Sequence, residues 1–161
     1  MILANVHCRL GREDAQLALH LLARGSADDY ARAESRLRDE GIDALLDDPR
    51  LLGALLESHR AAHASFPLFA YVVVRHALVQ AGEADRGIAD FVSAILIHFG
   101  FASRTNRVSD ADDEIYTTLG ELLEDVDDPD ARRSLLVRAH LGNYALWVSG
   151  LFPDWIESRR W

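Results

Sequence analysis

Helix start and stop signals recur along the whole chain, and they constrain its fold more than any other feature of the sequence. Asp48 and Asp128 each precede a proline, so their side chains can accept hydrogen bonds from the free N–H groups of a first helical turn. Ser26 and Ser65 can cap two further helices. Four of the expected helices end at a glycine, a common helix stop: Gly25, Gly41, Gly82 and Gly150. The chain is therefore expected to be a series of short helices.

Hydrophobic periodicity favours the same interpretation. The clearest case is residues 85–99, where apolar side chains recur every three or four positions, at Ile88, Phe91, Val92, Ile95, Leu96 and Phe99. Residues 67–81 contain three consecutive valines that also suit a strand, but the apolar pattern continues for over three helical turns. No Asn-Gly or similar hairpin signal separates alternating strands. We predict an all-α fold, a single domain over residues 1–161 with roughly seven helices around central helices near 67–81, 85–99 and 129–149.

The segment "HLGNYALWVSGLFPDW", residues 140–155, concentrates aromatic side chains at the end of the last long helix. Because residues 129–149 are apolar on nearly every side, we expect this helix to be buried by neighbours all round. Trp147, Phe152 and Trp155 are then expected to pack the helix end and the following turn onto the bundle.

Composition excludes several function classes. The formal net charge of −9 disfavours nucleic acid and anionic membrane surfaces as partners. All basic residues are arginine, which excludes Schiff-base chemistry on lysine and the phosphate-loop lysine, and which suits the codon bias of a GC-rich bacterial genome. The single cysteine, Cys8, cannot form an internal disulfide, and the N-terminus has no signal-peptide pattern, so a cytoplasmic location is expected.

A metal site is one candidate function. His59 and His63 are four residues apart, so on an α-helix they would share a face and could hold Zn or Fe. Position 60 is arginine, where a zinc protease has its catalytic glutamate, and no Glu-x-x-His motif of a di-iron bundle occurs. A third ligand would have to come from another helix. The alternative is a pair of histidines on the surface or at a helix end.

A small anionic ligand is a second candidate. Arg75 and His76 interrupt a very apolar helix, and a buried guanidinium must meet a carboxylate, carbonyl groups or an anionic ligand. A ligand pocket could combine these two residues with His140, or use His140, Asn143 and Tyr144. The alternative for Arg75 is an internal ion pair between helices.

An acidic stretch is a third candidate. Residues 110–130 carry ten carboxylates and no basic residue, which indicates either a docking surface for a basic partner or a solvated helix. Signatures of catalysis are missing from the chain: it contains no Gly-x-Ser-x-Gly elbow and no glycine-rich phosphate loop.

Residues 141–153 resemble a segment of a family of bacterial all-helical proteins of unknown function. In that segment Leu-Gly is followed by Asp or Asn, an apolar turn, Ser-Gly and Phe-Pro. The matching positions here are Gly142, Asn143, Leu146, Ser149, Gly150, Phe152 and Pro153. The resemblance implies an all-α bacterial protein and brings no activity. It also implies more chain after the Phe-Pro turn, so a C-terminal truncation with an exposed surface is expected.

The sequence favours a non-enzymatic protein that binds a protein partner or forms a homo-oligomer. Its expected contact residues are Trp147, Phe152, Trp155 and Trp161. The alternatives are a mononuclear metal site on His59 and His63, with hydrolytic activity as one option, and a carrier that holds a small anion on Arg75.

Overall fold

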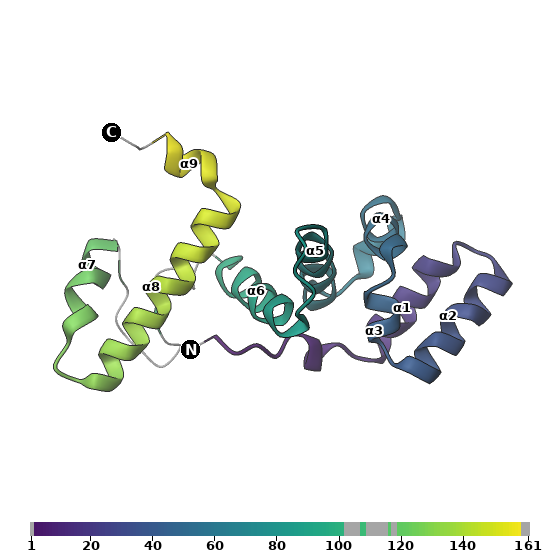
Figure 1. The fold of residues 1–161 in the computed structure, drawn as a ribbon, viewed down its shortest axis with the longest axis horizontal. Helices are drawn as coiled ribbons and strands as arrows, with labels where there is room; N and C mark the ends of the chain where they lie inside the picture. Colours follow the sequence, from purple (N-terminus) through teal and green to yellow (C-terminus); the bar gives the residue numbers. More distant parts are fainter. Residues whose placement is uncertain (1, 102–106, 109–115, 117–118, 159–161) are drawn as a thin grey trace. The chain divides into compact units, whose positions relative to one another are not determined.

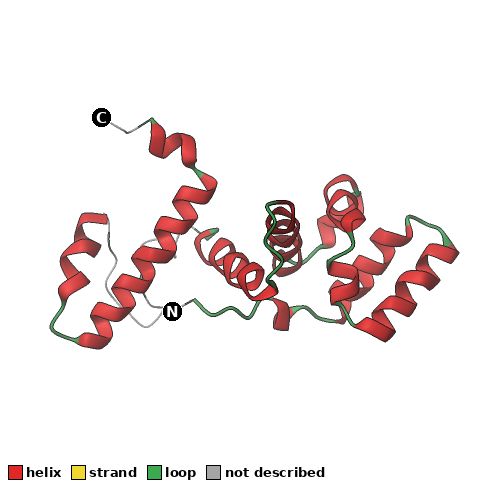
Figure 2. Cartoon of the chain, viewed as in Figure 1, coloured by secondary structure: helices red, strands yellow, loops and turns green. Residues whose placement is uncertain are grey.

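A computed structural model describes residues 2–101, 107–108, 116 and 119–158 of the chain. These residues form the α-helices α1 to α9 and short 3-10 helices, and no strand occurs among them (Figures 1 and 2). The prediction of an all-α fold is confirmed. None of the helices in the described ranges is both long enough and apolar enough to cross a membrane.

The chain divides into two compact units. The N-terminal unit is Ala4–Ala94, and the C-terminal unit is Ile95–Trp161 together with Met1–Leu3. Their boundary falls inside helix α6, Arg86–Phe99, so no linker segment separates them in the sequence. Of the three helices expected at the centre of a bundle, α5 belongs to the N-terminal unit, α8 belongs to the C-terminal unit, and α6 contributes to both.

Helices α1 to α5 build the N-terminal unit. Their bounds are Arg12–Ala23 for α1, Ala27–Glu40 for α2, Asp43–Leu46 for α3, Pro49–Glu57 for α4 and Phe66–Gln80 for α5. The three predicted caps are confirmed: Ser26, Asp48 and Ser65 each accept a hydrogen bond from a backbone N–H of the helix that follows. Local capping chemistry therefore sets where these helices begin.

The core of the N-terminal unit lies where α1, α3, α4 and α5 pack together. α1 packs against α2, α3 and α4, and α4 packs against α5. The largest fully buried apolar side chains of these helices are Leu45, Leu46, Leu51, Leu55, Leu68, Tyr71 and Val72. α2 buries only Ala33, as its short apolar stripe predicts.

The C-terminal unit contains α7, Leu119–Glu124; α8, Ala131–Leu151; and α9, Pro153–Glu157. Its small core consists of Val108, Tyr116, Leu122 and Val137. The prediction that Asp128 caps α8 is wrong by two residues. The cap is Asp130, which accepts a hydrogen bond from the Arg132 N–H at 2.9 Å. Asp128 instead accepts a hydrogen bond from the Asp130 N–H, which stabilises the turn that precedes α8.

The expectation that the last long helix is buried on all sides is wrong. Only Val137 and His140 of α8 are buried. At about 1.5 Å per residue, α8 is about 31 Å long and α7 about 9 Å long, so α7 is too short to cover it. Much of the apolar surface of α8 therefore faces outward, and Leu135 and Leu146 are 60% and 57% exposed.

Candidate functional site

The histidines predicted to bind a metal do not share a helix face. His59–His63 is a 3-10 helix, in which residues repeat every three positions, so side chains four positions apart point about 120° away from each other. Both histidines are exposed. Within the described ranges, no group of three or more His, Cys, Asp or Glu residues is placed to hold a metal ion. His59 and His63 therefore lack the α-helical geometry on which the Zn or Fe hypothesis depends.

Arg75 is buried and bonded within the N-terminal unit. Its Nε lies 2.8 Å from Asp47 Oδ1, and its Nη1 donates to the Ala84 carbonyl oxygen at 2.8 Å. The hydrogen bond to Asp47 raises the pKa of Arg75, which therefore stays charged. The ion-pair interpretation is the one that the geometry shows, and an anionic ligand would have to displace Asp47 to bind this guanidinium.

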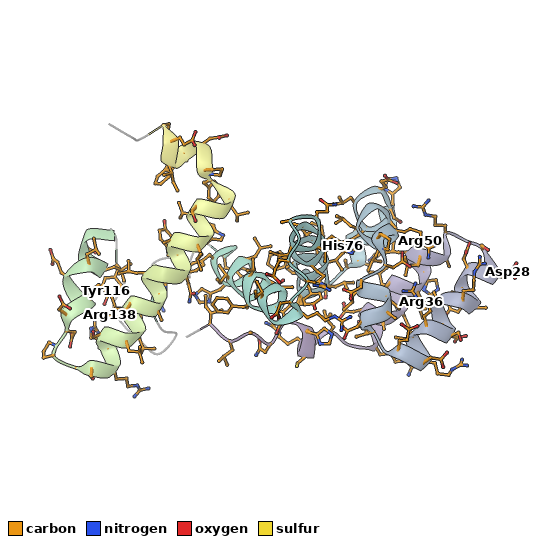
Figure 3. All side chains as sticks on the ribbon, in the orientation of Figure 1. Asp28, Arg36, Arg50, His76, Tyr116 and Arg138 are labelled. Atoms are coloured by element: carbon orange, nitrogen blue, oxygen red, sulfur yellow. The ribbon has the colours of Figure 1, made fainter. Side chains whose placement is uncertain are left out.

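Asp47 and the adjacent Asp48 together hold four arginines. Arg86 Nη2 lies 2.5 Å from Asp47, and Arg36 and Arg50, labelled in Figure 3, both bond to Asp48. Burial acts to raise the pKa of Asp47, but the hydrogen bonds from Arg75 and Arg86 outweigh it and the pKa lies below its usual value. The four arginines come from α2, α4, α5 and α6, so two acidic residues between α3 and α4 tie the helices of this unit together.

His76, also labelled in Figure 3, has a structural contact as well. Its Nε2 lies 3.0 Å from the Leu46 carbonyl oxygen at the end of α3. Arg75 and His76 therefore both bond α5 to the α3–α4 region.

His7 and Tyr71 belong to a second polar cluster that sequence reasoning missed. His7 Nε2 lies 2.8 Å from Asp43 Oδ1, and the His7 backbone N–H donates to Asp90 at 2.7 Å. The His7 ring packs on Tyr71, whose pKa burial raises to about 12. These contacts fix the N-terminal segment on α3, α5 and α6. No local sequence signal marks them, because the residues lie far apart along the chain.

The structure does not bring His140, Asn143 and Tyr144 together in one cavity. His140 is buried, and its ring meets Phe99 and His98 at centroid distances of 5.4 and 6.4 Å. The cavity beside His98, His140 and Asn143 has a volume of about 10 Å³, room for about one water molecule. Arg75 and His76 belong to the other unit. Tyr144 does not line the cavity beside His140 and instead lines a larger groove between α7, α8 and α9.

The aromatic residues at the end of α8 differ in how far they are covered. Trp147 packs against Phe99, Tyr144 and Phe152 at ring distances of 5.1 to 5.8 Å, as expected for a packing residue. Phe152 and Trp155 remain 45% and 47% exposed, so the expectation that they pack onto the bundle holds for only about half of the surface of each. Trp161 lies outside the described residues.

An open apolar groove of about 610 Å³ lies between α7, α8 and α9. Its lining includes Leu123 of α7, Leu141, Ala145, Leu146 and Val148 of α8, and Trp155 of α9. Ser149, which also lines it, donates its hydroxyl hydrogen bond to the Leu146 carbonyl oxygen. We call this feature the α8 groove. Tyr144 also lines the groove. Sequence reasoning named Trp155 as a contact residue and Tyr144 as a ligand-binding residue, and the apolar character of α8 on all sides is the signal for the others.

Comparison with protein families, with curated proteins and with solved structures finds no match for this chain. The candidate site is therefore defined by geometry alone.

Proposed function

We propose that this protein acts by binding another polypeptide through the α8 groove and has no catalytic activity of its own. The observation that carries the proposal is the exposure of large apolar side chains along the groove. Leu123 is 62% exposed, Leu146 57% and Trp155 47%. Contiguous apolar surface of this kind marks interaction sites more often than isolated exposed residues do.

The chemistry of the groove favours a polypeptide over a reacting substrate. Catalysis needs acids, bases or nucleophiles aimed into a cleft. Besides its apolar side chains and Trp155, the groove is lined, among the described residues, by only two hydroxyl groups, those of Tyr144 and of the internally bonded Ser149. The buried arginine and the half-buried histidine of α5, meanwhile, are held by bonds inside the N-terminal unit. The groove therefore offers area for burial and few groups that could act on a substrate.

Site-specific crosslinking in the native host tests the proposal. A photoreactive amino acid at Ala145, which lines the groove and is exposed, should give a discrete covalent adduct with a second polypeptide. The same amino acid at Leu135 is the control, since Leu135 is also exposed on the same helix but does not line the groove. Leu146→Asp should remove the Ala145 adduct. No adduct at Ala145, or the same adducts at both positions, would refute the proposal.

A further inference from the structure

Among the described residues, the charged side chains next in sequence to the lining residues of α7 and α9 are acidic. Glu124 follows the lining residue Leu123, and Asp154 and Glu157 are adjacent in sequence to the lining residues Trp155 and Ile156. All three carboxylates are exposed, and none pairs with a basic side chain within the described ranges.

No positive charge offsets these acids on the same elements. Residues 119–124 and 139–158, which form the groove, contain no arginine or lysine. The nearest arginines along α8 are already paired, Arg138 with Asp127 at 2.8 Å and Arg133 with Asp125 at 2.8 Å. We call Glu124, Asp154 and Glu157, which adjoin the lining residues in sequence, the acidic rim of the groove. No basic side chain within the described ranges pairs with them, so their charge is left for a partner to complement.

The shape of the groove indicates a helical occupant. It lies between helices, which present side chains and no free strand edge, so an extended peptide would gain no backbone ladder here. A helix with apolar side chains at positions i, i+3, i+4 and i+7 can pack along α8 and bury the leucines that α7 and α9 leave exposed.

Charge also distinguishes the candidate occupants. A second copy of this chain that paired groove against groove would bring two acidic rims together, which costs free energy. An anionic lipid surface would meet the same repulsion. A helix with arginine or lysine beside its apolar face complements both the groove and its rim.

We infer that the α8 groove binds an amphipathic helix of a different protein, with basic residues flanking the apolar face of that helix. This inference rests on the proposed function and adds the chemical class of the partner.

Two designed helical peptides test the inference by fluorescence anisotropy on the full chain. Both carry the same leucine face, one flanked by lysine and arginine and the other by glutamate. The basic peptide should bind at least tenfold more tightly at low salt, and this advantage should shrink as ionic strength rises. Leu146→Asp should abolish binding, and Leu135→Asp should not.

Charge reversal with a matched control separates the rim from the overall charge of the protein. Glu124→Lys, Asp154→Lys and Glu157→Lys together should reverse the preference, so that the acidic peptide binds more tightly. The control combines Glu13→Lys, Asp28→Lys and Glu40→Lys, which changes the net charge equally at exposed positions of the N-terminal unit. This control should keep the preference for the basic peptide, and circular dichroism of each variant verifies folding.

The outcomes distinguish the inference from the proposed function. If both peptides bind equally and Leu146→Asp abolishes both, the groove binds polypeptides but the inferred partner class is wrong. If sedimentation detects a dimer that Leu146→Asp dissociates, the occupant is a second copy of the chain and the inference is overturned. If the protein binds phosphatidylcholine vesicles and neither peptide, the occupant is a lipid surface and the inference is also overturned. If neither peptide binds and the Ala145 crosslink is also missing, both the inference and the proposed function fail.

Discussion

Helices α5 and α8 are both rich in apolar residues, yet they meet different surroundings. α5 has fifteen residues, six of which are buried, including the charged Arg75. α8 has twenty-one residues, only two of which are buried. The comparison shows that apolar composition predicts which helices could be buried, whereas the length and number of neighbouring helices determine how much burial occurs.

The buried arginine strengthens this conclusion. Arg75 has a place inside the N-terminal unit because Asp47 neutralises it, whereas Leu146 on α8 has no neighbour long enough to cover it. Burial in this molecule follows from what surrounds a side chain more than from how apolar the side chain is.

The largest expected effect comes from removing one leucine from each helix. Leu68→Ala in α5 should lower the free energy of unfolding by about 2–5 kcal/mol, because Leu68 is fully buried and the truncation leaves a cavity. Leu146→Ala should change it by less than about 0.5 kcal/mol, because the side chain is already largely hydrated. Urea unfolding followed by circular dichroism measures both. Equal losses would mean that α8 is covered in solution and would break the comparison.

A smaller effect is expected from the arginines of the two helices. Arg75→Met should lower the free energy of unfolding by about 1–3 kcal/mol, because it removes a buried donor to Asp47. The loss is limited because Asp47 keeps its hydrogen bond from Arg86. Arg138→Met should cost less than about 0.5 kcal/mol, since Arg138 and Asp127 form an exposed pair. Thermal unfolding of the two variants tests the comparison, which requires Arg75→Met to be more destabilising than Arg138→Met.

The last expected effect is a change in acid stability that arises in the N-terminal unit. Hydrogen bonds from Arg50 and Arg36 outweigh burial and hold the pKa of Asp48 well below its usual value. The folded state therefore resists protonation more than the unfolded chain does. This stabilisation is complete above about pH 4 and is lost as the pH falls further, at no more than about 1.4 kcal/mol per pH unit.

Asp48→Asn keeps a helix cap but removes this titration, so its unfolding free energy should fall less steeply than that of the wild type below pH 4. Unfolding curves from pH 6 to pH 2.5 provide the test. If the unfolding free energies of the two proteins fall equally steeply below pH 4, the ion pairs of Asp48 contribute little to stability.

Much of the fold could be predicted because its signals are local. Ser26, Asp48 and Ser65 act on N–H groups two or three residues away, and the sequence alone contains that information. The error at Asp128 has the same local origin, since Asp130 offers an equivalent carboxylate two residues later.

The candidate site depends on tertiary contacts and was harder to predict. The sequence indicates that Arg75 needs a carboxylate, but Asp47 is one of many acidic residues and lies twenty-eight positions away. His59 and His63 have the spacing of a metal pair only if their segment is α-helical, and the chain forms a 3-10 helix there. The α8 groove results from surface that α7 and α9 fail to cover, a property of helix lengths and not of any motif.

The Nε1–H group of Trp147 is buried without a hydrogen-bond partner among the described residues, while the Trp155 ring, eight positions later, is half open to solvent. An indole shielded from water fluoresces at shorter wavelength than a hydrated one. In a Trp161→Phe variant, the emission should therefore separate into a blue component from Trp147 and a red component from Trp155 that iodide quenches first. A polypeptide seated beside Trp155 would shift the red component alone, so the chain carries its own optical reporter of occupancy.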